Sequence, residues 1–180
     1  VVRSAASETY PSHFMLLCAM NHCKCGWFGH PSGRCRCTPA QVKRYLGKLS
    51  GPMLDRIDLF SEVPPLEFEN LADRSPGEPS AAIRARVTKA RERQSKRFGP
   101  DGPHCNAAMG QAEIRRFCAL DDEGQALMKG AYEHMGLTAR SYDRILRVAR
   151  TIADLEESES IRPGHLAEAL QFRPPEYLRR

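Results

Sequence analysis

The apolar positions of the chain predict strands near its start and helices after residue 80. Residues 13 to 20 form an apolar run without alternation, which predicts a strand buried on both faces, as in a parallel sheet. Residues 59 to 63 predict a second short strand, ended by a proline pair. Between them, Thr38 followed by proline is typical of a helix start, and we expect that helix to end at Gly51.

A connector rich in proline, glycine and acidic residues separates these strands from a region of helical periodicity. The apolar residues there form three stripes: Ile83, Val87, Ala90 and Phe98; Leu127, Ala131 and Met135; and Tyr142, Ile145, Ala149, Ile152 and Leu155. Thr138 can cap the helix of the third stripe, and Pro163 begins a last helix. The sequence therefore predicts an α/β fragment at residues 1–65, a linker at 66–79 and an all-helical domain at 80–180.

Composition narrows the class of protein. A chain with 41% hydrophobic and 27% charged residues is typical of a soluble globular protein, and its longest apolar run is too short to span a bilayer. No secretory signal is visible, so we expect a cytoplasmic protein without membrane contact. The net charge of +5 is concentrated, because seven of the fourteen residues from Arg84 to Arg97 are basic. Such a helix either contacts a polyanion or presents a solvated basic face.

The cysteines favour a metal site over disulfides. Four of the seven lie in one glycine-rich stretch as two Cys-x-Cys pairs separated by nine residues: Cys23, Cys25, Cys35 and Cys37. Four thiolates are the ligand set of a closed, structural Zn²⁺ site, although a one-residue gap is tighter than the usual spacing. His22 or His30 could replace one thiolate. Reduced, unliganded cysteines or a redox pair are the alternatives.

The same stretch combines one tryptophan with basic residues. Trp27 lies near Lys24, Arg34 and Arg36 in the sequence. An exposed aromatic ring beside basic side chains can stack on single-stranded bases while the charges follow the phosphates. Packing of Trp27 against the rest of the fold is the alternative.

Four short stretches occur in a fixed order along the chain: residues 19–26, 51–59, 83–87 and 139–154. Together they resemble the magnesium-chelatase-like AAA+ ATPases, and the likeness runs from about residue 3 to residue 173. The resemblance implies a fragment of an AAA+ α/β core that carries C-terminal strands of a parallel sheet, followed by an all-α lid. In that family the parts follow the order phosphate loop, Walker B strand, sensor 1, arginine finger and lid with sensor 2.

This chain looks like only the last three of those parts. It contains no Gly-x-x-x-x-Gly-Lys-Ser/Thr motif, and its acidic run at residues 121–123 lacks the preceding apolar strand of a Walker B motif. We therefore expect ATP and Mg²⁺ to be held mainly by a preceding half, and the isolated 180 residues to be inactive as an ATPase.

The resemblance assigns roles to individual side chains. Asn21 resembles sensor 1, an amide that can orient the attacking water, and Arg56 resembles the arginine finger offered to a neighbouring subunit. Arg140 resembles sensor 2 of the lid, with Arg144 as the second candidate because both lie on one helix. Without the resemblance, Asn21 would be a turn residue and Arg56 part of a surface ion pair.

Three functions remain open at this point. The first is a homo-oligomeric ring, hexameric by resemblance, whose ATP-driven lid does work on DNA in recombination or natural transformation. The second is a chelatase-type subunit that acts on a protein client, and the third is a zinc-stabilised nucleic-acid-binding module without catalysis. The cysteine loop and the basic helix favour DNA, with these candidate contacts: Lys24, Trp27, Arg34, Arg36, Arg84, Arg86, Lys89, Arg91 and Arg93.

Overall fold

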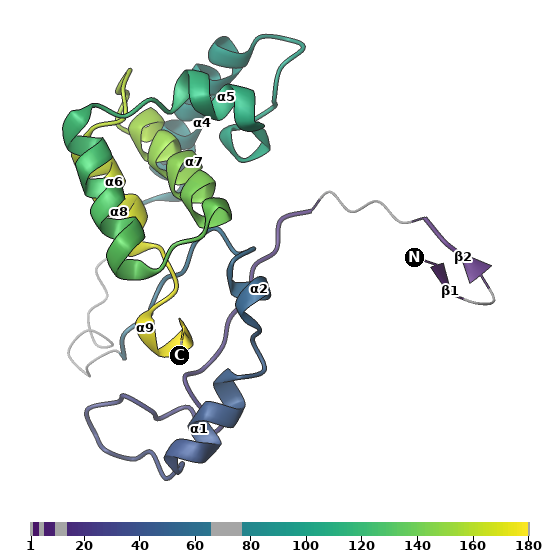
Figure 1. Cartoon of the computed structure of the whole chain (residues 1–180), viewed down its shortest axis with the longest axis vertical. Helices are drawn as coiled ribbons and strands as arrows, with labels where there is room; N and C mark the ends of the chain where they lie inside the picture. The colour runs from purple at the N-terminus through teal and green to yellow at the C-terminus, as the bar shows by residue number, and fades with distance from the viewer. Residues whose placement is uncertain (1, 4–5, 10–13, 66–76, 180) are drawn as a thin grey trace. The chain divides into compact units, whose positions relative to one another are not determined.

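The computed structural model describes residues 2–3, 6–9, 14–65 and 77–179, and it divides the chain into two units, Val1–Lys48 and Leu49–Arg180 (Figure 1). The first unit begins with β1 (Val2–Arg3) and β2 (Ala6–Ser7), which pair antiparallel in a two-stranded sheet. Residues 14–38 form neither helix nor strand and lead to α1 (Pro39–Leu46).

The expected buried strand at residues 13 to 20 does not form in the described residues. Residues 14 to 20 have no regular structure and are exposed, with Phe14 73% and Leu17 93% accessible, while His13 lies outside the described residues. Residues 59 to 63 are also neither helix nor strand. A parallel strand needs neighbours that accept its backbone hydrogen bonds, and the described part of the chain places no strand beside either segment.

Helix α1 starts where the sequence predicts it. The Thr38 hydroxyl accepts a hydrogen bond from the Gln41 amide, and the Gln41 side chain accepts one from the Thr38 amide, which completes a capping box. The helix ends at Gly47, earlier than predicted, and a separate turn begins at Ser50. Val42 is its buried residue.

From residue 77 to residue 179 the second unit consists of helices joined by turns and loops, without a strand, which agrees with the all-helical character predicted for this region. Thr138 caps α7 by accepting a hydrogen bond from the Ser141 amide, and α8 begins at Pro163, both as predicted. Among the described residues its elements are α2 (Gly51–Leu54), α4 (Ser80–Phe98), the 3-10 turn η1 (Asn106–Ala108), α5 (Gln111–Phe117), α6 (Asp122–Met135), α7 (Ala139–Leu155), α8 (Pro163–Gln171) and α9 (Glu176–Arg179). None of the described helices is long and apolar enough to cross a membrane.

Helix α7 lies at the centre of the helical core, where α4, α5 and α8 pack against it and α6 packs against α8 (Figure 1). Ala149 and Ala153 are fully buried on α7, and Leu166 of α8 is equally buried. The stripe predicted on α4 is buried only in its second half, because Ala90 is covered whereas Ile83 and Val87 are exposed. The first half of α4 therefore extends beyond the core.

A buried ion network fastens α4 and η1 to α7. Asp154 is completely buried and accepts hydrogen bonds from Arg97 and, at 2.8 Å, from the Asn106 amide. Arg150 lies 3.2 Å from the same carboxylate. Burial alone would raise the pKa of Asp154, but Arg97 and Asn106 stabilise the carboxylate more, so its pKa lies below the usual value. The network makes Arg97 a structural residue of this unit.

Candidate functional site

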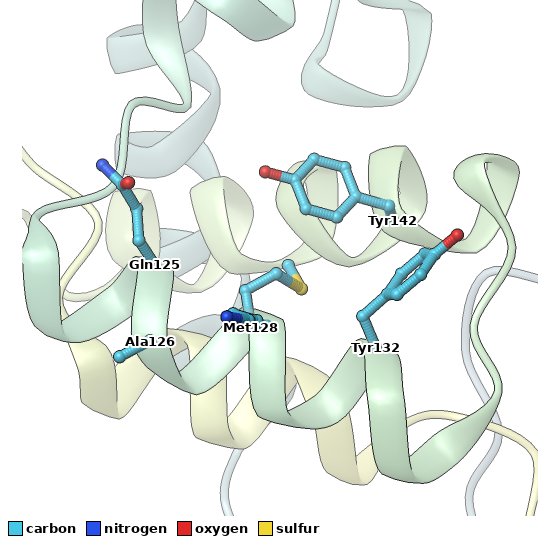
Figure 2. Close-up of a pocket in the computed structure, with 6 residues that line it drawn as sticks. Gln125, Ala126, Met128, Tyr132 and Tyr142 are labelled. Carbon is cyan, nitrogen blue, oxygen red and sulfur yellow. The ribbon is translucent and has the colours of Figure 1, made fainter.

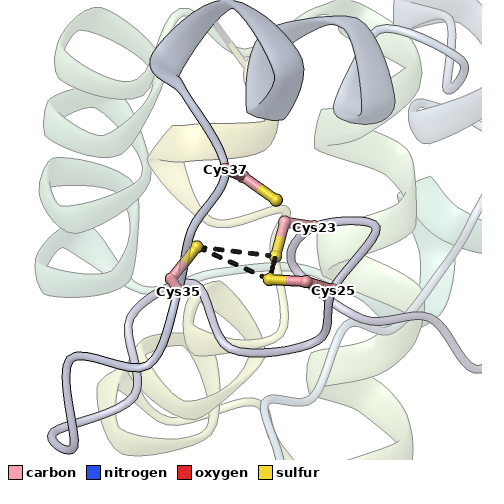
Figure 3. A group of neighbouring side chains, drawn as sticks. All are labelled: Cys23, Cys25, Cys35 and Cys37. Atoms are coloured by element: carbon pink, nitrogen blue, oxygen red, sulfur yellow. Dashed lines mark hydrogen bonds between the residues drawn. The ribbon is translucent and has the colours of Figure 1, made fainter.

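The four cysteines of the first unit converge in one loop (Figure 3). Gly26, Gly29 and Gly33 have positive φ values of 82°, 81° and 63°, a conformation that costs glycine least. Backbone bonds from Gly26 to Cys23, and from Gly33 to His30, close tight turns at these points. The turns fold the loop back so that its two Cys-x-Cys pairs face one another.

The sulfur positions suit a tetrahedral metal ion. The Sγ atoms of Cys23, Cys25, Cys35 and Cys37 all lie within 4.8 Å of one another, and Cys23 is 3.2 Å from Cys25 and 3.9 Å from Cys35. Four thiolates around Zn²⁺ at about 2.3 Å would be about 3.8 Å apart. The set can therefore hold a metal ion with little rearrangement. His30 uses Nδ1 to accept a 3.0 Å hydrogen bond from the Ser32 amide.

The loop favours the thiolate form of Cys23. Burial raises the pKa of Cys23, but hydrogen bonds from the Cys25 thiol and from the amides of Phe28 and Cys25 outweigh it and lower the pKa to about 6. Burial, followed by the neighbouring thiols, raises the pKa of Cys37 to about 12. Amide groups that point at sulfur are the outer contacts by which proteins orient thiolate ligands.

The cysteine loop, residues 23–37, also carries exposed aromatic and basic side chains. The Arg34 guanidinium lies 5.1 Å from the centre of the Trp27 ring, and the His30 ring meets the same indole edge-on at 4.9 Å. Trp27 is 37% exposed and Phe28 41% exposed, so both rings are accessible on the surface of this unit. Lys24, Arg34 and Arg36 are exposed as well. Of these basic residues, Arg34 is the one that the described structure places against Trp27.

Asn21 lies immediately before this loop. Its side chain is exposed, and its Nδ2 atom lies close to Gly26, where an added Cβ would be 3.6 Å away. Asn21 does not follow a strand in the structure, since residues 14 to 20 have no regular structure. Its predicted role as sensor 1 stays a prediction.

Arg56 lies just beyond α2 in the second unit. Its side chain is exposed, and Nη1 donates a 2.7 Å hydrogen bond to the Pro52 carbonyl of the same turn. Leu54, 4% exposed, anchors this turn. The segment continues along the helical unit, where the Phe60 amide donates a 2.9 Å hydrogen bond to the Phe172 carbonyl. Arg56 is therefore an accessible cation on a fixed segment.

The two sensor 2 candidates differ in their surroundings. Arg140 is exposed in the first turn of α7, and no ion pair of Arg140 occurs within the described residues. Arg144, one turn later, forms an ion pair with Asp58, and its side chain is 17% exposed. Sequence reasoning missed this contact, although Asp55 and Asp58 flank Arg56 at a spacing that a helix face could match.

The basic residues of α4 are largely paired with acids. Arg86 forms an ion pair with Glu78 at 2.8 Å, and Lys89 forms one with Glu157 at 3.2 Å. Arg93 pairs with Glu159. The remaining candidates on this helix are Arg91, which donates to Gln94 at 3.1 Å, and the exposed Arg84. These pairs lower the positive potential of the helix, so its surface would attract a polyanion less strongly than its sequence suggests.

A shallow cavity of about 490 Å³ lies between α6 and α7 (Figure 2). Two tyrosine rings face it from the two helices, Tyr132 from α6 and Tyr142 from α7, with Met128 at its floor. Gln125, Ala126 and Lys129 complete the lining. The residues that line it include no serine, cysteine, histidine or carboxylate, so this cavity lacks a nucleophile paired with a general base.

Comparison with known proteins places both parts of the chain. Residues 1–71 match the family model of the magnesium chelatase subunit ChlI, and residues 77–173 match that of its C-terminal region. The chain is 43% identical to the uncharacterized protein YifB of Escherichia coli and to competence protein ComM of Haemophilus influenzae. These alignments cover 95% and 96% of this chain and 33% of each relative, so the chain spans about a third of their length. A Mycobacterium tuberculosis relative, Rv2897c, is 37% identical over 91% of the chain. The chain therefore belongs to the magnesium-chelatase-like family that includes ComM and YifB.

Proposed function

We propose that this chain is part of an oligomeric AAA+ ATPase in which Arg56 completes the ATP site of the neighbouring subunit. The observation that supports this role is an exposed guanidinium on a segment that is itself fixed to the helical unit. Hydrolysis of ATP depends mainly on neutralising charge at the phosphoryl oxygens. A planar, permanently charged group suits that task, and a fixed segment limits the reorganisation required for it.

Two further side chains take part in the proposed site. Asn21 orients the attacking water or contacts the γ-phosphate, and Arg140 reaches the phosphates from the first turn of α7. ATP and Mg²⁺ are held mainly by the phosphate loop and Walker B strand of the full-length protein, since the 180 residues carry neither motif. The subunits form a ring of six copies. We place this ring in the cytoplasm.

Replacement of Arg56 by alanine in the full-length protein tests this proposal. Turnover should fall by about 10³-fold or more, while ATP affinity stays nearly unchanged, because the finger acts on charge that develops during transfer. Arg44→Ala, an exposed arginine on α1, is the matched control and should keep full turnover. Unaltered turnover of Arg56→Ala would remove Arg56 from the ATP site.

The cysteine loop is proposed as a structural zinc site. Four protein ligands leave no open coordination position, so the metal would stabilise the loop and take no part in hydrolysis. A loop without an apolar core of its own, such as residues 23–37 in which only Cys23 is buried, depends on such a cross-link for its shape.

DNA is the proposed substrate of the motor. One relative carries the name competence protein, and the exposed Trp27, Phe28 and Arg34 of the cysteine loop provide stacking and charge for single-stranded DNA. The alternatives are a chelatase-type subunit with a protein client and a zinc-stabilised binding module without catalysis. A protein client requires no aromatic and basic loop, which is why we favour DNA, with a role in recombination during natural transformation.

A further inference from the structure

The segment that carries Arg56 is attached to the helical unit at several points along its length. Ser141, in the first turn of α7, donates a hydrogen bond of 3.5 Å to Asp55. Arg144, one turn further along the same helix, forms the ion pair with Asp58. The attachment points thus lie on both sides of Arg56.

The attachment continues beyond the aspartates. The Phe60 amide donates a hydrogen bond to the Phe172 carbonyl, which lies just after α8. Two residues further along the segment, Glu62 forms a hydrogen bond with Tyr177 of α9. Burial, together with that carboxylate, raises the pKa of Tyr177 to about 12, so the hydroxyl stays a donor at neutral pH. Three helices therefore hold one extended segment.

We infer that Asp58 and Arg144 form a latch that sets the position of Arg56, which makes Arg144 a positioning residue and leaves sensor 2 to Arg140. This inference rests on the proposed role of Arg56 as a finger. Asp55 and Asp58 are three residues apart, and so are their partners Ser141 and Arg144 on α7. Two contacts at matched spacing fix both the place and the direction of the segment.

The charges around the latch favour its closed form. Arg144 is largely buried, and its Nε atom has no hydrogen-bond partner among the described residues. Loss of Asp58 would leave this guanidinium covered and without an anionic partner, which is costly. The N-terminus of α7 also attracts negative charge, and Asp55 lies at its first turn. In this pair Asp58 occupies the Nη1 atom of Arg144, whereas Arg140 has no ion pair within the described residues.

A charge exchange in the full-length protein tests the latch. The variants are Arg144→Asp, Asp58→Arg and the double variant, with Glu78→Arg as the control for loss of an ion pair, the one between Glu78 and Arg86 of α4. Hydrogen exchange of the peptide that spans residues 53 to 62 is measured without nucleotide, and exchange of the second half of α7 reports intact folding. ATP turnover of each variant is measured in parallel.

The latch predicts that each single charge reversal raises exchange of residues 53 to 62 by about tenfold or more, and that the double variant restores protection. Each single change should lower kcat by about tenfold with little change in KM, and the double variant should recover most of it. The Glu78→Arg control should resemble the unaltered protein in both measurements.

Two results would overturn the inference. Unchanged exchange in both single variants would show that the pair does not hold the segment. Restored exchange without restored turnover, combined with a raised KM for ATP in Arg144→Asp, would make Arg144 a nucleotide contact. The exchange measurement needs no ATP, so a protein that never hydrolyses ATP would refute the proposed finger while the latch is still judged by its own readout.

Discussion

The sequence identifies candidate functional residues where they fall in a motif. It does not identify the residues that these side chains contact. Helical spacing places Arg140 and Arg144 on one face of α7 and cannot separate them. The structure distinguishes them because Asp58, 86 residues away, pairs with Arg144. Likewise, the basic run on α4 is visible in the sequence, whereas its partners Glu157 and Glu159 come from a loop after α7. Contacts between distant segments depend on packing, which local patterns do not contain.

Replacement of Asp154 tests how much the buried ion network contributes to the stability of the helical core. Asp154→Asn leaves Arg97 and Arg150 without their shared anion in a covered environment, and we expect a loss of about 3 to 5 kcal/mol of unfolding free energy. Urea denaturation followed by circular dichroism measures it, with the exposed Glu168→Gln on α8 as control. A loss below about 1 kcal/mol would mean that the network contributes little.

The same residue predicts a direction for pH dependence. The pKa of Asp154 is lowered in the folded chain, so its contribution is present above the unfolded value of about 3.8 and is lost as pH falls through the lower folded value. Stability of the unaltered chain should therefore decline more than that of Asp154→Asn at strongly acidic pH.

Elements differ in how well the sequence predicted them. Helices satisfy their own backbone hydrogen bonds, so local signals such as Thr38, Thr138 and Pro163 were sufficient to place their starts. An apolar run such as residues 14 to 20 predicts burial, but the pairing that makes it a strand depends on segments elsewhere. The cysteine loop was predicted as a ligand set, while its closure depends on glycine turns that spacing alone does not show.

We expect the cysteine loop to bind zinc. The purified chain should carry about one Zn²⁺, and chelation should alter the fluorescence of Trp27, the only tryptophan, because the loop loses its cross-link. Cys35→Ser should lower the metal content, and Cys105→Ser should not, since Cys105 lies outside the cluster. Protein never exposed to chelator that holds no metal, with unchanged emission on chelation, would contradict the zinc site.

We expect the same loop to contact single-stranded DNA. Joint replacement of Lys24, Arg34 and Arg36 by alanine should reduce the slope of log affinity against log salt for single-stranded DNA by about 2, because three phosphate contacts are lost. The corresponding change on α4, Arg86 with Lys89 and Arg93, should have a smaller effect, since these side chains are paired with acids. An unchanged slope in the loop variant would assign its basic residues to solvent.

At the scale of the whole molecule, the proposed functional residues are divided between the two units. Asn21 and the cysteine loop belong to Val1–Lys48, whereas Arg56 and Arg140 belong to Leu49–Arg180. The chain spans about a third of its relatives' length and lacks a phosphate-loop motif, so in our account the ATP site is completed by the rest of the protein and by a neighbouring subunit. That division makes the central claim, a finger that acts between subunits, open to a direct experiment.

Subunit mixing tests that claim. Full-length protein with Arg56→Ala and full-length protein altered in its phosphate loop should each be inactive alone. Mixed rings should recover part of the turnover, because some interfaces then join an intact phosphate loop to an intact Arg56 of the adjacent subunit. Mixed rings, verified by native mass spectrometry, that stay inactive would contradict a finger that acts between subunits.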